Sequence, residues 1–166
     1  MQGQALDKPH GRGLVDSARF LKSLMVAPRL TGAVAPSGRA LARAMAAAAG
    51  PPPHGIIVEL GPGTGPVTRS LIESGVARER LALIEYDPGF CRLLKQRFAP
   101  AKIIQGDAYD LPRTLAELAG QRIGAVVSSL PLLNQPPERR EKLFGEAFAL
   151  MGPSGRFVQF LSLIHI

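Results

Sequence analysis

The segment Ile56-Ile57-Val58-Glu59-Leu60-Gly61-Pro62-Gly63-Thr64-Gly65-Pro66 joins an apolar run to a loop with glycine at every second position. An apolar run of this kind is typical of a buried parallel strand, because both of its faces are covered. The glycines let the backbone turn sharply and approach a ligand where a Cβ atom would clash. The segment therefore predicts a buried strand followed by a ligand-binding loop.

Two kinds of ligand fit such a loop. The dinucleotide-binding fingerprint is GxGxxG, in which the third glycine allows close packing of helix and strand. Here the third glycine, Gly65, comes one residue early, and Pro66 occupies the expected position. An acidic strand end such as Glu59 followed by GxGxG resembles motif I of the Rossmann-like methyltransferases that use S-adenosylmethionine.

Two more apolar runs lead to a carboxylate. Residues 81–84 are followed by Glu85, about 20 residues past the loop, which is the spacing at which a nucleotide fold offers an acid to ribose hydroxyls. A carboxylate can accept hydrogen bonds from both hydroxyls of a vicinal diol. Residues 103–105 lead through Gly106 to Asp107. Since open parallel sheets bind ligands at the carboxyl ends of their strands, we expect both acids at one edge.

The rest of the pattern alternates strands and helices, which predicts an α/β fold with a doubly wound parallel sheet. A fourth apolar run, residues 123–127, passes into a polar loop, and a fifth strand is predicted at residues 156–160. A helix is predicted to begin at Pro36-Ser37, with Ser37 as its N-cap, and to end at Gly50. Further helices are predicted at residues 68–74, 88–98, 111–119 and 136–151.

Basic residues are concentrated ahead of the glycine loop, since residues 1–50 carry +5 of the formal net charge of +7. Apolar residues from Leu14 to Met25 repeat at helical spacing. Three basic residues fall on a different face: Arg12, Arg19 and Lys22. A basic amphipathic helix is typical of a membrane surface or a nucleic-acid contact. A helix packed on the domain with a solvated charged face is an equally simple alternative.

The chain has 166 residues, a length that indicates a single domain. We expect basic amphipathic helices over residues 1–50 and a cofactor-binding domain over residues 54–160, separated by a proline run. The chain has no run of about 18 apolar residues, so no membrane span is predicted. The single cysteine, Cys91, excludes an internal disulfide, and no metal site is predicted.

Six segments together resemble a known family. They are GAVAPSGRALARAMA, VELGPGTGPVTRSLIESGV, LALIEYDPGFCRLLKQRF, QGDAYDL, SSLPLLN and GRFVQF. They look like the bacterial phospholipid N-methyltransferases, a family similar to the ribosomal RNA adenine dimethyltransferases. The resemblance covers residues 18–160. It implies a Rossmann-like class I methyltransferase that transfers methyl groups from S-adenosylmethionine to the amine of phosphatidylethanolamine at a membrane surface.

The resemblance also implies residue roles. The cofactor would be held by residues of the glycine loop and the strand ends: Glu59, Gly61, Gly63, Thr64, Gly65, Glu85, Tyr86, Asp107 and Ala108. Among them, Glu85 would bind the ribose hydroxyls and Asp107 the adenine. The acceptor loop, Ser128, Ser129, Leu130 and Pro131, would present backbone carbonyls and a hydroxyl to the acceptor nitrogen. The sequence offers no convincing general base: Tyr86 and Tyr109 are candidates only because they lie next to the ends of these motifs, and a packing or rim role is the simpler interpretation of both.

The acceptor loop separates the alternatives. RNA adenine dimethyltransferases have an aromatic residue in an N-L-P-Y-like loop, which stacks on the extruded base. The corresponding residue here is Leu132, which cannot stack as a ring does, so an aliphatic rim facing a lipid is expected. An RNA adenine or a small molecule remains the alternative acceptor, and an inactive truncated fragment is the third interpretation.

A lipid substrate implies a peripheral protein. Arg12, Arg19 and Lys22 would draw the chain to anionic lipid, each contributing on the order of 1 kcal/mol. The chain would then be cytoplasmic and peripheral on the inner face of the cytoplasmic membrane.

The C-terminal end departs from the family. The family's sheet has seven strands, of which five are predicted here, and residues 161–166 (LSLIHI) no longer follow the family pattern. We expect a truncated or non-native tail over residues 161–166. An exposed sheet edge would then favour aggregation.

Overall fold

The computed structural model describes residues 34–52 and 54–161. Five parallel strands form one sheet in the order β3-β2-β1-β4-β5. Their bounds are Ile56–Leu60 (β1), Leu81–Glu85 (β2), Lys102–Gln105 (β3), Ile123–Ser128 (β4) and Arg156–Gln159 (β5). The strand order reverses between β1 and β4, which is where open α/β sheets bind their ligands. The predicted doubly wound, Rossmann-like fold is confirmed.

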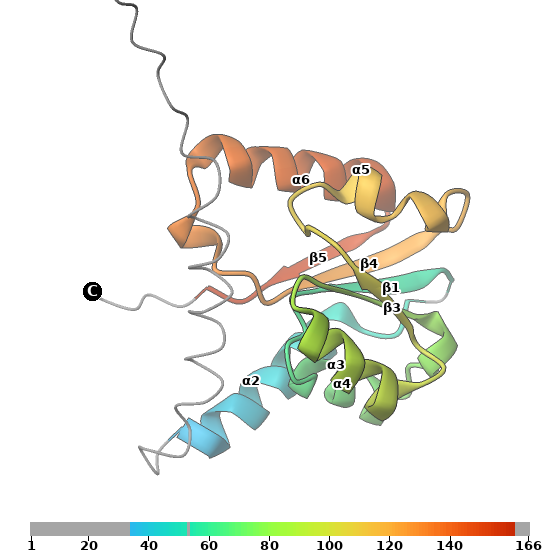
Figure 1. The fold of residues 1–166 in the computed structure, drawn as a ribbon, viewed down its shortest axis with the longest axis vertical. Coiled ribbons are helices and arrows are strands. Elements are labelled where there is room, and N and C mark those ends of the chain that lie inside the picture. The colour runs from blue at the N-terminus through green and yellow to red at the C-terminus, as the bar shows by residue number, and fades with distance from the viewer. Residues whose placement is uncertain (1–33, 53, 162–166) are drawn as a thin grey trace, which may run out of the picture.

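Helices cover both faces of the sheet (Figure 1). One face carries α2 (Val34–Ala49), α3 (Pro66–Glu73) and α4 (Pro88–Phe98). The other carries α5 (Leu111–Thr114) and α6 (Pro137–Met151). Short 3-10 turns lie at Arg78–Arg80, Ala116–Leu118 and Leu132–Asn134. The result is a three-layer sandwich with the sheet in the middle.

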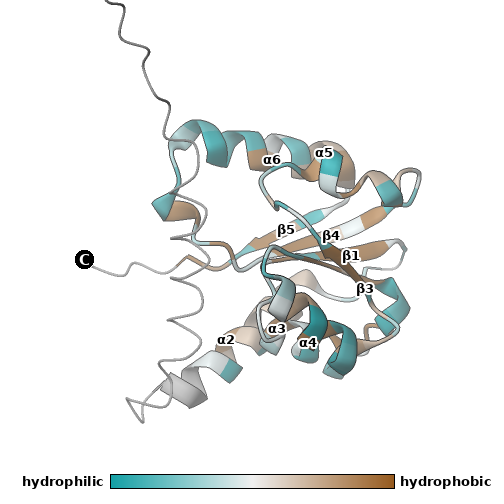
Figure 2. Cartoon of the chain, viewed as in Figure 1, coloured by the Kyte–Doolittle hydropathy of each residue, from teal (hydrophilic) through white to brown (hydrophobic). Residues whose placement is uncertain are grey.

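The core consists of two apolar layers, one on each face of the sheet. In β1, Ile57 packs towards α2 and α3, whereas Val58 and Leu60 pack towards α5 and α6. Figure 2 shows the resulting contrast between the hydrophobic central strands and the hydrophilic outer surface of α4 and α6. Because both faces are covered, the strands are apolar without alternation. Cys91 is buried in α4.

The register of the sheet brings the predicted site residues to one edge. Leu60 lies beside Ile84 and Ser128, and Glu85 lies beside Gln105. The loops that follow β1, β2, β3 and β4 therefore leave the sheet at the same level. This is the carboxyl edge, to which the glycine loop, Glu85, Asp107 and Ser129 all belong.

The predicted starts of two helices were wrong. The helix α2 begins at Val34, so Ser37 lies inside it and is not the N-cap. Proline is tolerated in a first turn, whose N–H groups have no intrahelical partner, and Pro36 therefore does not mark the start. The helix α3 begins at Pro66 rather than Thr68, because Pro66 fits the first helical position.

The predicted helix over residues 111–119 is divided into α5 and a 3-10 turn. The apolar spacing correctly indicated which side chains face the core, since Leu111, Leu115 and Leu118 are all buried. Tertiary contacts hold this segment at its first turn: the Leu111 amide donates to Glu146 Oε2 at 3.0 Å, and the Thr114 hydroxyl donates to the Asp107 carbonyl at 2.8 Å. The spacing of leucines alone does not distinguish a continuous helix from this broken one.

The helix α2 precedes the predicted domain boundary and packs on the sheet through Ala42, Met45, Ala46 and Ala49. Arg12, Arg19 and Lys22 lie outside the described residues, as do residues 162–166 of the predicted tail. Over the described ranges, no helix is both long enough and apolar enough to cross a membrane. In the same ranges, no three His, Cys, Asp or Glu side chains gather in a way that could hold a metal ion.

Candidate active site

The glycine loop has a backbone that suits only glycine at three positions. Gly61, Gly63 and Gly65 have φ angles of 67°, 57° and 83°, in the left-handed region. At Gly65 a Cβ atom would also collide with the ring of Phe98. The loop closes on itself, since the Gly65 amide donates to the Pro62 carbonyl at 2.9 Å. The loop therefore lies close to the sheet edge and leads directly into α3.

Glu85 joins this loop to the end of β2. Its Oε2 accepts a hydrogen bond from the Gly63 amide at 3.0 Å, and its Oε1 accepts one from the Asp87 amide at 2.9 Å. The side chain is buried. Each carboxylate oxygen has two lone pairs, so both can still accept a hydroxyl. The geometry thus leaves Glu85 free to bind a diol while it fixes the loop.

Glu59 lies beneath the loop and is fully buried. Its Oε2 accepts a hydrogen bond from the Thr68 hydroxyl of α3 at 2.6 Å. Its Oε1 has no partner within the described part of the chain. Burial raises the pKa of Glu59 to about 7, although the hydrogen bonds from Thr68 act in the opposite direction. Glu59 therefore lies at the base of the site as a carboxyl group with one spare acceptor.

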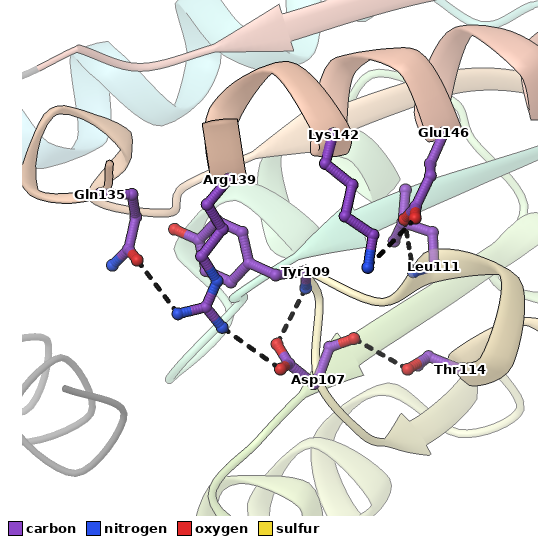
Figure 3. A network of polar contacts seen from close by, with 8 residues as sticks. All are labelled: Asp107, Tyr109, Leu111, Thr114, Gln135, Arg139, Lys142 and Glu146. Atoms are coloured by element: carbon purple, nitrogen blue, oxygen red, sulfur yellow. Dashed lines mark hydrogen bonds and ion pairs between the residues drawn. The ribbon is translucent and has the colours of Figure 1, made fainter. Parts of the chain in front are cut away.

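Asp107 lies in a polar network that extends to α6 (Figure 3). Its Oδ1 accepts a hydrogen bond from the Tyr109 amide at 2.9 Å, and its Oδ2 lies 3.4 Å from Arg139 Nη2. The Arg139 guanidinium is 4.2 Å from the centre of the Tyr109 ring and also donates to Gln135 Oε1 at 3.2 Å. Sequence reasoning missed Arg139, because it lies 32 residues from Asp107 on a helix with no motif.

Tyr109 is not suited to accept a proton. Its ring is buried, and its hydroxyl has no hydrogen-bond partner among residues 34–52 and 54–161. Burial raises the pKa of Tyr109 to about 12, while the nearby Arg139 lowers it in part. The phenol therefore stays protonated at neutral pH.

A cavity of about 470 Å³ lies between the ends of β2 and β3. Tyr86, Pro88, Gln105 and Gly106 line it, and the Tyr86 side chain is 49% exposed. In the sequence, all four lining residues fall between Glu85 and Asp107. A flat ring system bound there would have Tyr86 as one wall.

The acceptor loop presents fewer groups than predicted. The Ser128 carbonyl accepts from the Phe160 amide at 3.2 Å, and the Leu130 carbonyl accepts from Gln159 Nε2 at 3.0 Å. Ser128 is fully buried, and its hydroxyl oxygen accepts from the Leu130 amide at 3.4 Å. Ser129 is partly exposed, and among the described residues its hydroxyl and carbonyl make no hydrogen bond.

The prediction that Leu132 forms an aliphatic rim was wrong. Leu132 is buried in the core, and the next residue, Leu133, is 42% exposed. In the 3-10 turn over Leu132–Asn134 successive side chains point in different directions, so Leu132 faces the core and Leu133 faces solvent. The exposed aliphatic side chain in this loop is therefore Leu133.

Comparison with known proteins agrees with this geometry. Residues 57–155 match the family described as Methyltransferase domain, so the chain belongs to that family. The fold is that of the class I methyltransferases, a class whose cofactor is S-adenosylmethionine.

Two curated relatives are similar over part of their length. The ornithine lipid N-methyltransferase of Singulisphaera acidiphila is 36% identical over 63% of this chain and 56% of that protein. The ribosomal RNA small subunit methyltransferase A of Methylococcus capsulatus is 44% identical over 51% of this chain and 32% of that protein. The chain thus spans about half, or less, of the curated relatives that it matches.

Solved structures share the fold. The 1,6-didemethyltoxoflavin-N1-methyltransferase of Burkholderia thailandensis superposes with a TM-score of 0.61 at 21% identity, over 95% of this chain and 66% of that one. A TehB-like methyltransferase of Corynebacterium glutamicum gives a TM-score of 0.58 at 20% identity, over 89% of this chain and 73% of that one. At these identities the likeness concerns the fold alone.

Proposed function

We propose that this chain transfers methyl groups from S-adenosylmethionine to the amine of a lipid headgroup, with phosphatidylethanolamine as the acceptor. The similarity to an ornithine lipid N-methyltransferase supports a lipid amine as the acceptor class. The segments that resemble the phospholipid N-methyltransferases support the particular headgroup.

The distribution of exposed apolar side chains carries the lipid proposal. Among the described residues, six large apolar side chains are exposed, and four of them follow the carboxyl ends of strands: Tyr86, Leu133, Phe160 and Leu161. Exposed apolar side chains spread along this edge favour an apolar partner there, and a membrane surface is one. Because this edge also carries the candidate cofactor residues, a lipid approaching it would bring its headgroup to the reacting methyl group.

The residues at the edge fit the cofactor. Glu85 would accept the ribose hydroxyls, and the cavity beside Tyr86 would take the adenine, with Asp107 following the lining residue Gly106 in the chain. Glu59 and the glycines Gly61, Gly63 and Gly65 would surround the methionine part, and within the described ranges Glu59 Oε1 has no hydrogen-bond partner. The bound cofactor supplies an activated methyl group, so the protein's task is orientation.

The chain's own contribution to the reaction is to align the amine. Ser129 lies next to the end of β1, because its amide donates to the Leu60 carbonyl at 3.0 Å, and within residues 34–52 and 54–161 its own carbonyl and hydroxyl make no hydrogen bond. Both groups can accept a hydrogen bond from an amine and direct its lone pair towards the methyl group. Tyr109, being protonated, does not take the amine proton.

RNA is the second candidate acceptor, because the 44% identical relative is a ribosomal RNA methyltransferase. The stretch Ser128–Asn134 contains no aromatic ring to stack on a base. This difference favours the lipid.

Methyl transfer to separate acceptors tests the proposal. Labelled S-adenosylmethionine is incubated with the chain and with vesicles of phosphatidylethanolamine and phosphatidylglycerol, with vesicles of phosphatidylcholine and phosphatidylglycerol, or with ribosomal RNA. We expect label in the phosphatidylethanolamine sample and not in the phosphatidylcholine sample. Label confined to RNA would contradict the proposal.

A further inference from the structure

A basic cavity of about 600 Å³ lies beside the glycine loop. Four arginines line it: Arg39 and Arg43 from α2, Arg69 from α3 and Arg97 from α4. We call these four residues and their cavity the arginine pocket. Glu73 is the single carboxylate in its wall, and Thr64 and Gly65 connect the pocket to the candidate cofactor site.

The positive charge of this pocket is not balanced within the described ranges. The ion pairs found there involve Lys102, Arg139 and Lys142, and none involves the four arginines. Arg39 and Arg43 are one helical turn apart on α2, and like charges at this spacing destabilise a helix. A bound anion would offset the repulsion between these two arginines, so anion binding would be favourable.

One arginine is already held in position. Arg97 Nη1 donates a hydrogen bond to the Thr64 carbonyl at 3.0 Å, which leaves its other N–H groups available. A guanidinium has five donors in a planar fork that matches two oxygens of a phosphate. The first turn of α3, at Pro66, also lies in the wall and adds the positive end of a helix dipole.

We propose that the arginine pocket binds the phosphate of an anionic phospholipid and thereby holds the glycine-loop side of the domain against a membrane. The inference rests on the proposed function, since it is the lipid acceptor that brings the protein to a membrane. Lipid phosphate is favoured over RNA phosphate because the exposed apolar side chains Tyr86, Leu133 and Phe160 lie at the same carboxyl edge as the loop. A lipid surface offers both phosphates and an apolar interior to such an edge.

Vesicle co-sedimentation of the full chain tests this pocket. The vesicles are phosphatidylcholine with or without phosphatidylglycerol, and the variant is Arg39→Gln combined with Arg43→Gln. The matched control is Arg113→Gln, which removes an exposed arginine from α5 on the opposite face of the sheet. We expect the double variant to bind the phosphatidylglycerol vesicles about tenfold more weakly, and Arg113→Gln to bind within about twofold of the parent chain.

Two further arms identify the source of the phosphate. Inorganic phosphate is titrated against the vesicles at constant ionic strength, and a single-stranded RNA is offered in their place. If inorganic phosphate displaces the chain from the vesicles only at concentrations far above that of the lipid, the result supports a lipid site. Equal affinity for inorganic phosphate, or a loss in the double variant that is confined to RNA, would overturn the proposal.

The result is independent of methyl transfer. Binding of S-adenosylmethionine and the thermal unfolding temperature should be the same in the double variant and the parent chain, which excludes a folding defect. If the parent chain methylates no lipid but loses vesicle binding in the double variant, the proposed function fails and the pocket stands. If the parent chain methylates lipid and the double variant binds vesicles as the parent does, the proposal for the arginine pocket is wrong while the proposed function stands.

Discussion

Glu85 Oε2 accepts a hydrogen bond from the Gly63 amide at 3.0 Å, and this contact joins the end of β2 to the loop that follows β1. The two residues are 22 positions apart in the sequence. A carboxylate makes a strong hydrogen bond to a backbone amide, so this contact fixes the position of the Glu85 side chain. The same side chain thus sets the shape of the loop and offers oxygens to a ribose.

Gly65→Ala should destabilise the fold by more than its backbone strain alone. A residue with a Cβ at this φ costs about 1–2 kcal/mol, and collision with Phe98 adds about 1–3 kcal/mol. Gly120 has the same φ of +83° with nothing within 4 Å of the built Cβ, so Gly120→Ala is the matched control. Urea unfolding should show a larger loss in the free energy of unfolding for Gly65→Ala than for Gly120→Ala. Equal losses would show that the collision with Phe98 adds nothing.

Stability should depend on the protonation of Glu59. Its pKa is about 7 in the folded state against an ordinary value of 4.5, so above pH 4.5 the unfolded chain loses a proton that the folded chain keeps. The free energy of unfolding therefore falls by about 3 kcal/mol between these two pH values and levels off above them. Glu59→Gln should flatten this slope in urea unfolding between pH 4.5 and pH 8, and an unchanged slope would assign it to another group.

The ion pair between Asp107 and Arg139 should contribute little to stability. Both side chains are about one-third exposed, at 33% and 30%, so solvent screens the pair. A double-mutant cycle with Asp107→Asn and Arg139→Gln should give a coupling of about 0.5 kcal/mol that decreases with added salt. A coupling above about 2 kcal/mol would show a pair shielded from solvent, contrary to this geometry.

Ser129 and Ser128 should differ in their effects on the acceptor. Ser129→Ala removes a hydroxyl that makes no hydrogen bond among the described residues, so KM for the lipid should rise about fivefold with no change in cofactor affinity. Ser128→Ala removes a buried hydroxyl that accepts from the Leu130 amide, so it should lower stability by about 1 kcal/mol and leave KM unchanged. Steady-state kinetics measures KM, and calorimetry measures stability and cofactor affinity. A raised KM for Ser128→Ala with an unchanged KM for Ser129→Ala would contradict these assignments.

Elements with strong local signals could be predicted from the sequence. The helix α4 has its predicted bounds because Asp87 Oδ1 accepts from the amides of Gly89 and Phe90, at 2.7 and 3.0 Å, and Pro88 occupies the first helical position. The glycine loop could be predicted for the same reason, since its backbone conformation requires glycine. Signals of this kind are contained within a few consecutive residues.

Features that depend on tertiary contacts could not be predicted. Leu132 and Leu133 are equally apolar, and only the 3-10 turn places one in the core and the other in solvent. Arg139 reaches Asp107 because the loop after β3 leads into α5, which packs against α6, and no local pattern indicates this contact. The arginine pocket likewise assembles side chains from three helices.

Calorimetric titration of S-adenosylmethionine tests the central claim, that the glycine loop and Glu85 form a methyltransferase cofactor site. The chain should bind the cofactor, Glu85→Ala should lose at least about tenfold in affinity, and Glu117→Ala, which removes an exposed carboxylate from the turn after α5, should bind as the parent does. Thermal unfolding without cofactor checks that Glu85→Ala remains folded. Undiminished affinity in a folded Glu85→Ala, or no binding by the parent chain, would contradict the account.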